Sequence, residues 1–88
     1  MASGFDRSEG YEIIAKEVYS TTRSGQQEQI ALGRNETKYG TMYVTWDCTV
    51  WPLKDGSTKT DYYWGHYFDD ENKARADYHH RLTEKYER

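Results

Sequence analysis

The stretch from Tyr62 to Leu82, YYWGHYFDDENKARADYHHRL, constrains the fold most because its hydrophobic period changes halfway along. Its first part is dense in aromatic side chains, which favour the half-buried surface of a strand over a helix. In a strand, alternate residues share a face. One face is expected to carry Tyr62, Trp64, His66 and Phe68, and the other Tyr63, Gly65 and Tyr67. Asp69 and Asp70 follow where this strand is expected to turn into a helix.

The second part predicts a C-terminal helix near residues 70–86. Apolar residues recur there every four positions, which forms one stripe of a helix: Ala74, Tyr78, Leu82 and Tyr86. Asp69 or Asp70 can cap the first turn, and Glu71 places negative charge near the positive end of the helix dipole. Acid–base pairs at four-residue spacing support an exposed helix: Glu71 with Arg75, Asp77 with Arg81, and Glu84 with Arg88. Arg75 falls near the stripe, so we expect its stem to pack and its guanidinium to reach water.

Three further strands are predicted upstream, near residues 11–19, 27–34 and 41–51, with the fourth near 61–68. Residues 41–51 alternate most clearly, with an apolar face made of Met42, Val44, Trp46, Cys48 and Val50. Residues 11–19 show no clean period, so a helix is the alternative there, although their β-branched and aromatic content favours a strand. Short links between successive strands favour antiparallel pairing.

The predicted fold class is therefore α+β, a four-stranded antiparallel meander sheet with one C-terminal helix packed on its apolar face. The expected core is made of Ile30, Leu32, Val44, Trp46, Cys48, Trp64, Phe68, Ala74, Tyr78 and Leu82. Residues 1–9 are small and polar and are expected to form a flexible arm, which leaves residues 10–88 as a single domain.

Composition narrows the class of function. The net charge of −3 disfavours attraction to nucleic acid and to acidic membranes. Cys48 is the single cysteine, so an internal disulfide is excluded and a reducing compartment is expected. The sequence shows no signal-peptide core and no apolar run long enough to span a bilayer, so we expect a cytoplasmic protein.

The residues able to carry chemistry do not form a known catalytic or metal-binding pattern. His79 and His80 are neighbours on the predicted helix and point about 100° apart, so they cannot chelate one ion together, and the partners of His66 on its strand are unknown. The acids from Asp69 to Glu71 are expected to be helix caps. Cys48 lies on the apolar face and is expected to pack in the core. We therefore expect no catalytic residue, no metal and no cofactor.

Three segments of the second half of the chain, YVTWDCTVW, DYYWGHYFDD and ARADYHHRL, resemble a family of small domains found in phages and mobile genetic elements of Gram-positive bacteria. The residues that carry the resemblance are Tyr43 to Trp46, Trp64 to Phe68, and Ala74 with Tyr78 and Arg81. The loop PLKDGSTKT is longer than this pattern has. The family has no assigned activity, so the resemblance implies a setting and no catalytic residues.

Aromatic residues on the non-core sides of two neighbouring strands are the candidate binding site: Tyr43, Trp51, Tyr63, Gly65 and Tyr67. Such rings can pair across strands and only stabilise the sheet, can bind a protein partner, or can stack unpaired bases. We expect a small non-catalytic protein-binding protein of a phage or mobile element, for example a nuclease inhibitor in the anti-defence class. The alternative is a weak single-stranded nucleic-acid-binding module. The sequence leaves the oligomeric state open.

Overall fold

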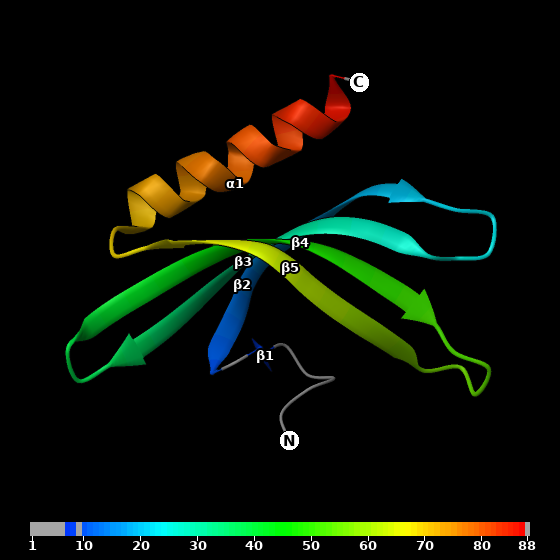
Figure 1. Cartoon of the computed structure of the whole chain (residues 1–88), viewed down its shortest axis with the longest axis horizontal. Helices are drawn as coiled ribbons and strands as arrows, with labels where there is room; N and C mark the ends of the chain where they lie inside the picture. The colour runs from blue at the N-terminus through cyan, green and yellow to red at the C-terminus, as the bar shows by residue number, and fades with distance from the viewer. Residues whose placement is uncertain (1–6, 9, 88) are drawn as a thin grey trace.

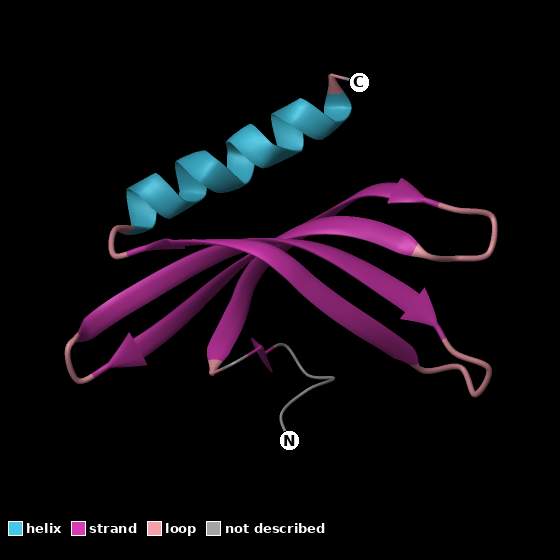
Figure 2. Cartoon of the chain, in the orientation of Figure 1, coloured by secondary structure: helices cyan, strands magenta, loops and turns pink. Residues whose placement is uncertain are grey.

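The computed structural model describes residues 7–8 and 10–87. Figures 1 and 2 show one twisted sheet with a single helix lying across one side of it. Within the described residues the sheet is an antiparallel meander in the order β1-β2-β3-β4-β5, followed by helix α1. The elements are β1 (Arg7–Ser8), β2 (Tyr11–Thr21), β3 (Gln27–Thr37), β4 (Gly40–Pro52), β5 (Thr58–Phe68) and α1 (Glu71–Tyr86).

The predicted α+β class, the four long strands and the C-terminal helix are confirmed. The segment near residues 11–19 is strand β2, so the helical alternative there is wrong. Strand β1 adds a two-residue pairing at the edge of the sheet. The rest of the arm expected over residues 1–9, namely residues 1–6 and 9, lies outside the described residues.

The helix covers the face of β4 that the sequence assigned to solvent. Tyr43 on β4 packs with Ile30, Leu32 and the helix residues Ala74, Tyr78 and Leu82, and we call this the helix side of the sheet. Val44, Trp46 and Cys48 form a second cluster with Ala31 on the opposite side, which we call the open side. The expectation that the helix lies on the Val44–Trp46–Cys48 face is therefore wrong. The alternation was correct, but both faces of β4 are buried, and the helix side includes the buried polar residues Thr45, Asp47 and Thr49.

A β-bulge in β5 explains a second error. Asp47 pairs with Tyr63 and Thr45 pairs with His66, so Trp64 and Gly65 together lie opposite Trp46. The extra residue reverses the alternation, which puts both Tyr63 and His66 on the helix side. Trp64 was expected in the core, but the bulge turns it outward and it is 71 % exposed.

Two similar irregularities interrupt β2. Its register against β3 shifts between Ile13 and Ala15 and again between Val18 and Ser20. Each shift inserts one extra residue, which is why no period of two is visible in this segment. Tyr19, the extra residue of the second shift, packs against the helix-side cluster.

Helix α1 begins at the cap that the sequence predicts. The Asp70 carboxylate accepts hydrogen bonds from the backbone amides of Asn72 and Lys73. The buried residues of the helix are Ala74, Tyr78, Arg81 and Leu82. Tyr86, predicted on the buried stripe, is 57 % exposed and donates its hydroxyl hydrogen bond to Glu17. No helix in the described part of the chain is both long enough and apolar enough to cross a membrane.

On the open side, the Trp46 indole lies between two glycines of the neighbouring strands. A Cβ atom on Gly33 would come within 2.8 Å of Trp46 Cζ3, and one on Gly65 within 3.2 Å of Trp46 Nε1. The rings of Tyr11 and Tyr62 pack against the indole, with centroid distances of 5.8 and 5.0 Å. The missing side chains of both glycines therefore allow a large ring to lie over the sheet, where it is 4 % exposed.

Candidate functional site

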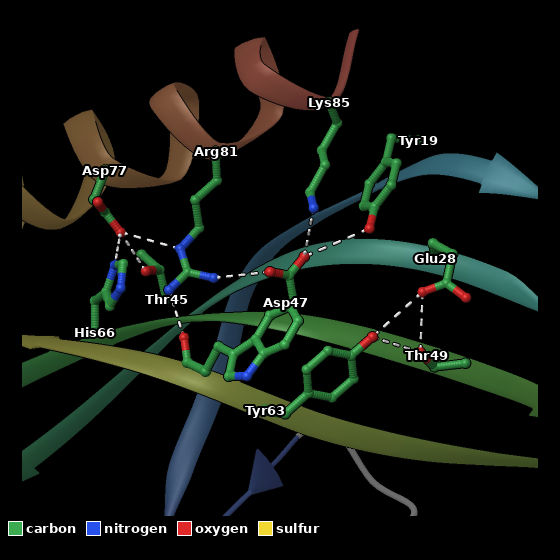
Figure 3. A network of polar contacts seen from close by, with 11 residues as sticks. Tyr19, Glu28, Thr45, Asp47, Thr49, Tyr63, His66, Asp77, Arg81 and Lys85 are labelled. Atoms are coloured by element: carbon green, nitrogen blue, oxygen red, sulfur yellow. Dashed lines mark hydrogen bonds and ion pairs between the residues drawn. The ribbon is translucent and has the colours of Figure 1, made fainter. Parts of the chain in front are cut away.

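An ion cluster made of Asp47, Asp77, Arg81 and Lys85 joins the helix to the middle of the sheet (Figure 3). Arg81 Nη1 lies 3.2 Å from Asp47 Oδ2, and Lys85 Nζ lies 3.7 Å from Asp47 Oδ1. Arg81 and Asp47 are both buried, with side-chain exposures of 7 % and 8 %. A charge pair this well buried is costly to break because either partner alone would be left unpaired away from water.

Arg81 uses its guanidinium group to contact three parts of the fold. Its Nε donates to Asp77 Oδ2 one turn back on the helix, and its Nη1 donates to Asp47 on β4. Its Nη2 donates to the backbone carbonyl oxygen of Trp64 at the bulge of β5. No buried side-chain nitrogen or oxygen within the described residues lacks a hydrogen-bond partner. Arg81 therefore fixes the bulge from the helix.

Asp77 is the second acceptor of the cluster. Its Oδ2 accepts hydrogen bonds from Thr45 Oγ1 at 2.6 Å and from Arg81 Nε at 3.2 Å, and it lies 2.9 Å from His66 Nδ1. Burial alone raises the pKa of the Asp77 carboxyl, but the hydrogen bonds from Thr45, His66 and Arg81 outweigh it. The pKa of Asp77 is therefore lowered from its ordinary value of 3.8, and the carboxylate is ionised at neutral pH.

Trp64, whose backbone carbonyl oxygen Arg81 contacts, has an exposed side chain. Its backbone φ is +58°, and it is the single non-glycine residue with a positive φ in the described part of the chain. Left-handed backbone costs an ordinary L-residue about 1–2 kcal/mol, so the surrounding contacts must hold Trp64 there. The ring of Tyr63 supports the indole edge-on at a centroid distance of 5.1 Å. The result is a large apolar ring held in water at a strained position.

A cleft of about 580 Å³ adjoins Trp64, between β5 and the C-terminal half of α1. It is lined by Asp47, Trp64, His66, Asp77, His80, Arg81, Glu84 and Lys85. Two of the cations that line the cleft, Arg81 and Lys85, already form ion pairs with Asp47. His80 and Glu84 form an exposed pair at the rim, 3.4 Å apart. The cleft therefore offers both signs of charge beside the indole, without a free basic surface.

A second polar group extends the helix side towards the other end of the sheet (Figure 3). Glu28 Oε1 accepts a hydrogen bond from Thr49 Oγ1 at 3.0 Å, and the Thr49 and Tyr63 hydroxyl oxygens lie 2.7 Å apart. Burial, followed by the negative charge of Asp47, raises the pKa of Tyr19 to about 12. Tyr19 stays protonated and donates to Asp47 Oδ1 at 3.5 Å. These contacts support the Tyr63 ring on which Trp64 rests.

The five residues predicted as one binding site are divided between the two sides of the sheet. Tyr43 is 7 % exposed beneath the helix, and Tyr63 is half-buried in the polar group just described. Trp51, 41 % exposed, donates from its indole Nε1 to Asp61 on the same side. Gly65 and Tyr67 lie on the open side, because Gly65 follows the bulge and Tyr67 pairs with Val44. The space beside Gly65 is filled, because Trp46 Nε1 and Tyr67 Cε1 both lie 3.2 Å from the place where its Cβ would be.

Cys48 and Asp70 lie where the sequence predicts them, in the core and at the start of the helix. Cys48 is 1 % exposed, and burial raises the pKa of its thiol to about 12, which makes it a poor nucleophile. Asp70 caps the helix, and the predicted pairs Glu71–Arg75 and Asp77–Arg81 are present. Arg88, the partner expected for Glu84, lies outside the described residues. No group of three or more potential metal ligands gathers among the residues that the structure describes.

The buried pair of Arg81 and Asp47 was not predicted, because Arg75 was the basic residue expected near the helix stripe. Arg75 is 45 % exposed and pairs with Glu71, whereas Arg81 is the buried residue. A signal for Arg81 was present, since it lies three residues after Tyr78 and seven after Ala74, both on the buried stripe. Asp47 had the matching signal, an acid in the middle of the longest strand.

No protein-family model matches the chain, and comparisons with curated proteins and with solved structures give no match either. The resemblance to small domains of phages and mobile elements therefore stays a prediction.

Proposed function

We propose that this chain is a non-catalytic protein-binding module that contacts its partner through the Trp64 indole and the cleft beside it. The observation that carries the proposal is the combination of exposure and strain at Trp64, which is 71 % exposed with a φ of +58°. Strained residues persist when the surrounding structure fixes them, and they cluster at functional sites. Bulges also re-aim side chains next to such sites.

The chemistry of the site fits a protein partner. Tryptophan is among the residues most enriched at the energetic centres of protein interfaces, where a buried ring is surrounded by polar contacts. Around Trp64 that polar surround consists of His66, His80 and Glu84, all with side chains more than half exposed. A partner that offers an apolar pocket for the indole and hydrogen-bonding groups at its edge would match both features.

A single-stranded nucleic-acid module is the alternative, because an exposed indole can also stack on a base. Such proteins combine the ring with a basic groove that follows the phosphates. Here Arg81 and Lys85 are both paired with Asp47, and the net charge is −3. We therefore rank protein binding above nucleic-acid binding.

The resemblance to phage and mobile-element domains adds a narrower form of the proposal, in which the partner is a nuclease of bacterial defence in the cytoplasm. Every acidic residue of strands β2–β5 lies on the helix side of the sheet: Glu12, Glu17, Glu28, Glu36, Asp47 and Asp61. All of them except Asp47 are at least partly exposed there. The basic, nucleic-acid-binding cleft of a nuclease would therefore meet carboxylates on the same side as the ion cluster. A purified nuclease inhibited by this chain, and released by Trp64→Ala, would support this form.

The test of the general proposal needs no known partner. Peptides selected for binding from a random library against the wild-type chain should lose at least about tenfold in affinity for Trp64→Ala, since interface tryptophans contribute 2 kcal/mol or more. Trp51→Ala is the matched control, because Trp51 is also an exposed tryptophan on the helix side. Peptides that bind both variants like the wild type would contradict the proposal.

The same titrations separate the two classes of partner. Binding of a single-stranded oligonucleotide that weakens steeply with salt and depends on Trp64 would favour the nucleic-acid module. Peptide binding that changes little with salt, together with no oligonucleotide binding, is the result that the protein-binding proposal expects.

A further inference from the structure

The open side of the sheet is almost free of charge. The residues of β2–β5 that face it include one charged side chain, Lys16, which pairs with Ala31 of β3. All the acidic residues of these strands face the helix side instead. In a chain in which 31 % of residues are charged, this separation leaves the open side of strands β2–β5 without carboxylates.

Aromatic and aliphatic side chains cover the middle of the open side. Trp46 lies at the centre, with Tyr11, Tyr62 and Ile13 packed around its cluster. Tyr67 is 57 % exposed, and its ring meets that of Tyr11 edge-on at a centroid distance of 6.3 Å. Among the described residues, neither a helix nor a second sheet packs on this side. A sheet with two apolar faces is normally covered on both.

The size of the open side matches a standard protein interface. Strand β3 has 11 residues, which at ~3.3 Å per residue is roughly 36 Å long. The four long strands, spaced ~4.8 Å apart, are together roughly 19 Å wide. Their product is a footprint of roughly 700 Å² for the sheet, of the same order as the ~800 Å² of accessible surface that each partner buries in a stable complex.

We propose that a second copy of this chain covers the open side, so that two sheets pack face to face with their helices outermost. Two acidic copies repel each other least where they meet through a surface without carboxylates, and the open side of β2–β5 is such a surface. The open side of β2–β5 has one charged residue, Lys16, so it offers no group of charges that would attract a partner of opposite charge. Twofold contacts of this kind are the commonest in homo-oligomers, and they require a patch that complements itself.

Pairing through the edge of the sheet is a poorer route to the same dimer. Strand β5 is an edge strand of the sheet, but its ladder is interrupted at Trp64, where the backbone has a positive φ. Bulges of this kind twist an edge away from further pairing. Face-to-face packing leaves the cleft beside Trp64 uncovered, because that cleft lies on the helix side, so this inference is independent of the function proposed for Trp64.

Sedimentation equilibrium and light scattering between about 1 µM and 1 mM test the proposal over the range in which contacts of this size dissociate. The wild-type chain should reach twice the 10.4 kDa mass of one copy. Tyr67→Glu should raise the dimer dissociation constant about a hundredfold or more, because the change enters the twofold interface twice. Val18→Glu should do the same from strand β2, where Val18 is 38 % exposed on the open side.

Tyr39→Glu is the matched control, since Tyr39 is 88 % exposed in the turn between β3 and β4. It should dimerise like the wild type, and circular dichroism should show all three variants folded. A wild-type chain that stays monomeric throughout the range would overturn the proposal and leave the open side to a different partner. Equal dissociation of Tyr39→Glu and Tyr67→Glu would overturn it as well.

Discussion

Replacing Arg81 with methionine should reveal how strongly the ion cluster holds the helix on the sheet. The change removes the guanidinium donors to Asp47, Asp77 and the Trp64 carbonyl oxygen while keeping an apolar side chain of similar length. Asp47, with a side chain 8 % exposed, is then a buried carboxylate with only weak partners, Lys85 at 3.7 Å and Tyr19 at 3.5 Å.

The expected loss in the free energy of unfolding is about 3 kcal/mol. Removing one partner of a buried ion pair usually costs about 3–5 kcal/mol. The low end applies here because Lys85 and Tyr19 still contact Asp47 and because the Asp77 side chain is 20 % exposed. A domain of 88 residues has a total stability of roughly 4–13 kcal/mol, so the variant is expected to be marginal.

Urea unfolding followed by circular dichroism, with an osmolyte present to keep the variants folded, measures this loss. The double variant Arg81→Met/Asp47→Leu should lose less stability than the sum of the two single changes, by at least about 1 kcal/mol. Each single change leaves one charge of the buried pair without its partner, whereas the double variant removes both charges. Arg81→Lys is the control that keeps the charge but not the planar fork, and it should lie between wild type and Arg81→Met. A loss below about 1 kcal/mol for Arg81→Met, with additive double-variant effects, would refute the buried pair.

Three further predictions follow from the described contacts. Gly33→Ala should destabilise by about 1–3 kcal/mol in a thermal or urea melt, because its Cβ would lie 2.8 Å from the buried Trp46 ring, and an unchanged melt would show that the indole lies elsewhere. The native thiol of Cys48, buried and with a pKa of about 12, should react with a thiol reagent far more slowly than after denaturation, and rapid native labelling would contradict its burial. The lowered pKa of Asp77 stabilises the fold above the ordinary carboxyl pKa of 3.8, and this stability is lost as the pH falls through the lower folded value. Urea melts between pH 5 and pH 2 should therefore show a flatter acid decline for Asp77→Asn than for wild type, and parallel declines would mean that Asp77 is not the group involved.

The local pattern of the sequence predicts β4 and α1 well because each of these two elements has its own period. Residues 41–51 alternate and lie in β4, and the acid at Asp70 caps α1. Register with a period of two also predicts which β4 residues share a face. It cannot tell which face the helix covers when both are buried, and the buried ion pair made the helix side look like a solvent face.

The candidate site depended on two features that have no local signature. A bulge changes the count of residues between strands, so Trp64 reads as an ordinary core position until the pairing with β4 is known. The contact from Arg81 to the Trp64 carbonyl joins residues 17 positions apart, and no periodic pattern encodes it. Gly65 beside Trp64 was the one local hint, since an isolated glycine within a strand often marks a bulge.

We propose that the fold holds Trp64 in a strained position that presents its indole to a protein partner. Measuring the stability of Trp64→Gly and Trp64→Ala, together with their affinity for a peptide selected on the wild-type chain, tests that claim directly. Glycine accepts the φ of +58° without strain and alanine does not, so Trp64→Gly should be more stable than Trp64→Ala by about 1 kcal/mol. Both variants should lose the peptide by at least about tenfold. Wild-type affinity in either variant, or a Trp64→Gly chain less stable than Trp64→Ala, would contradict the account.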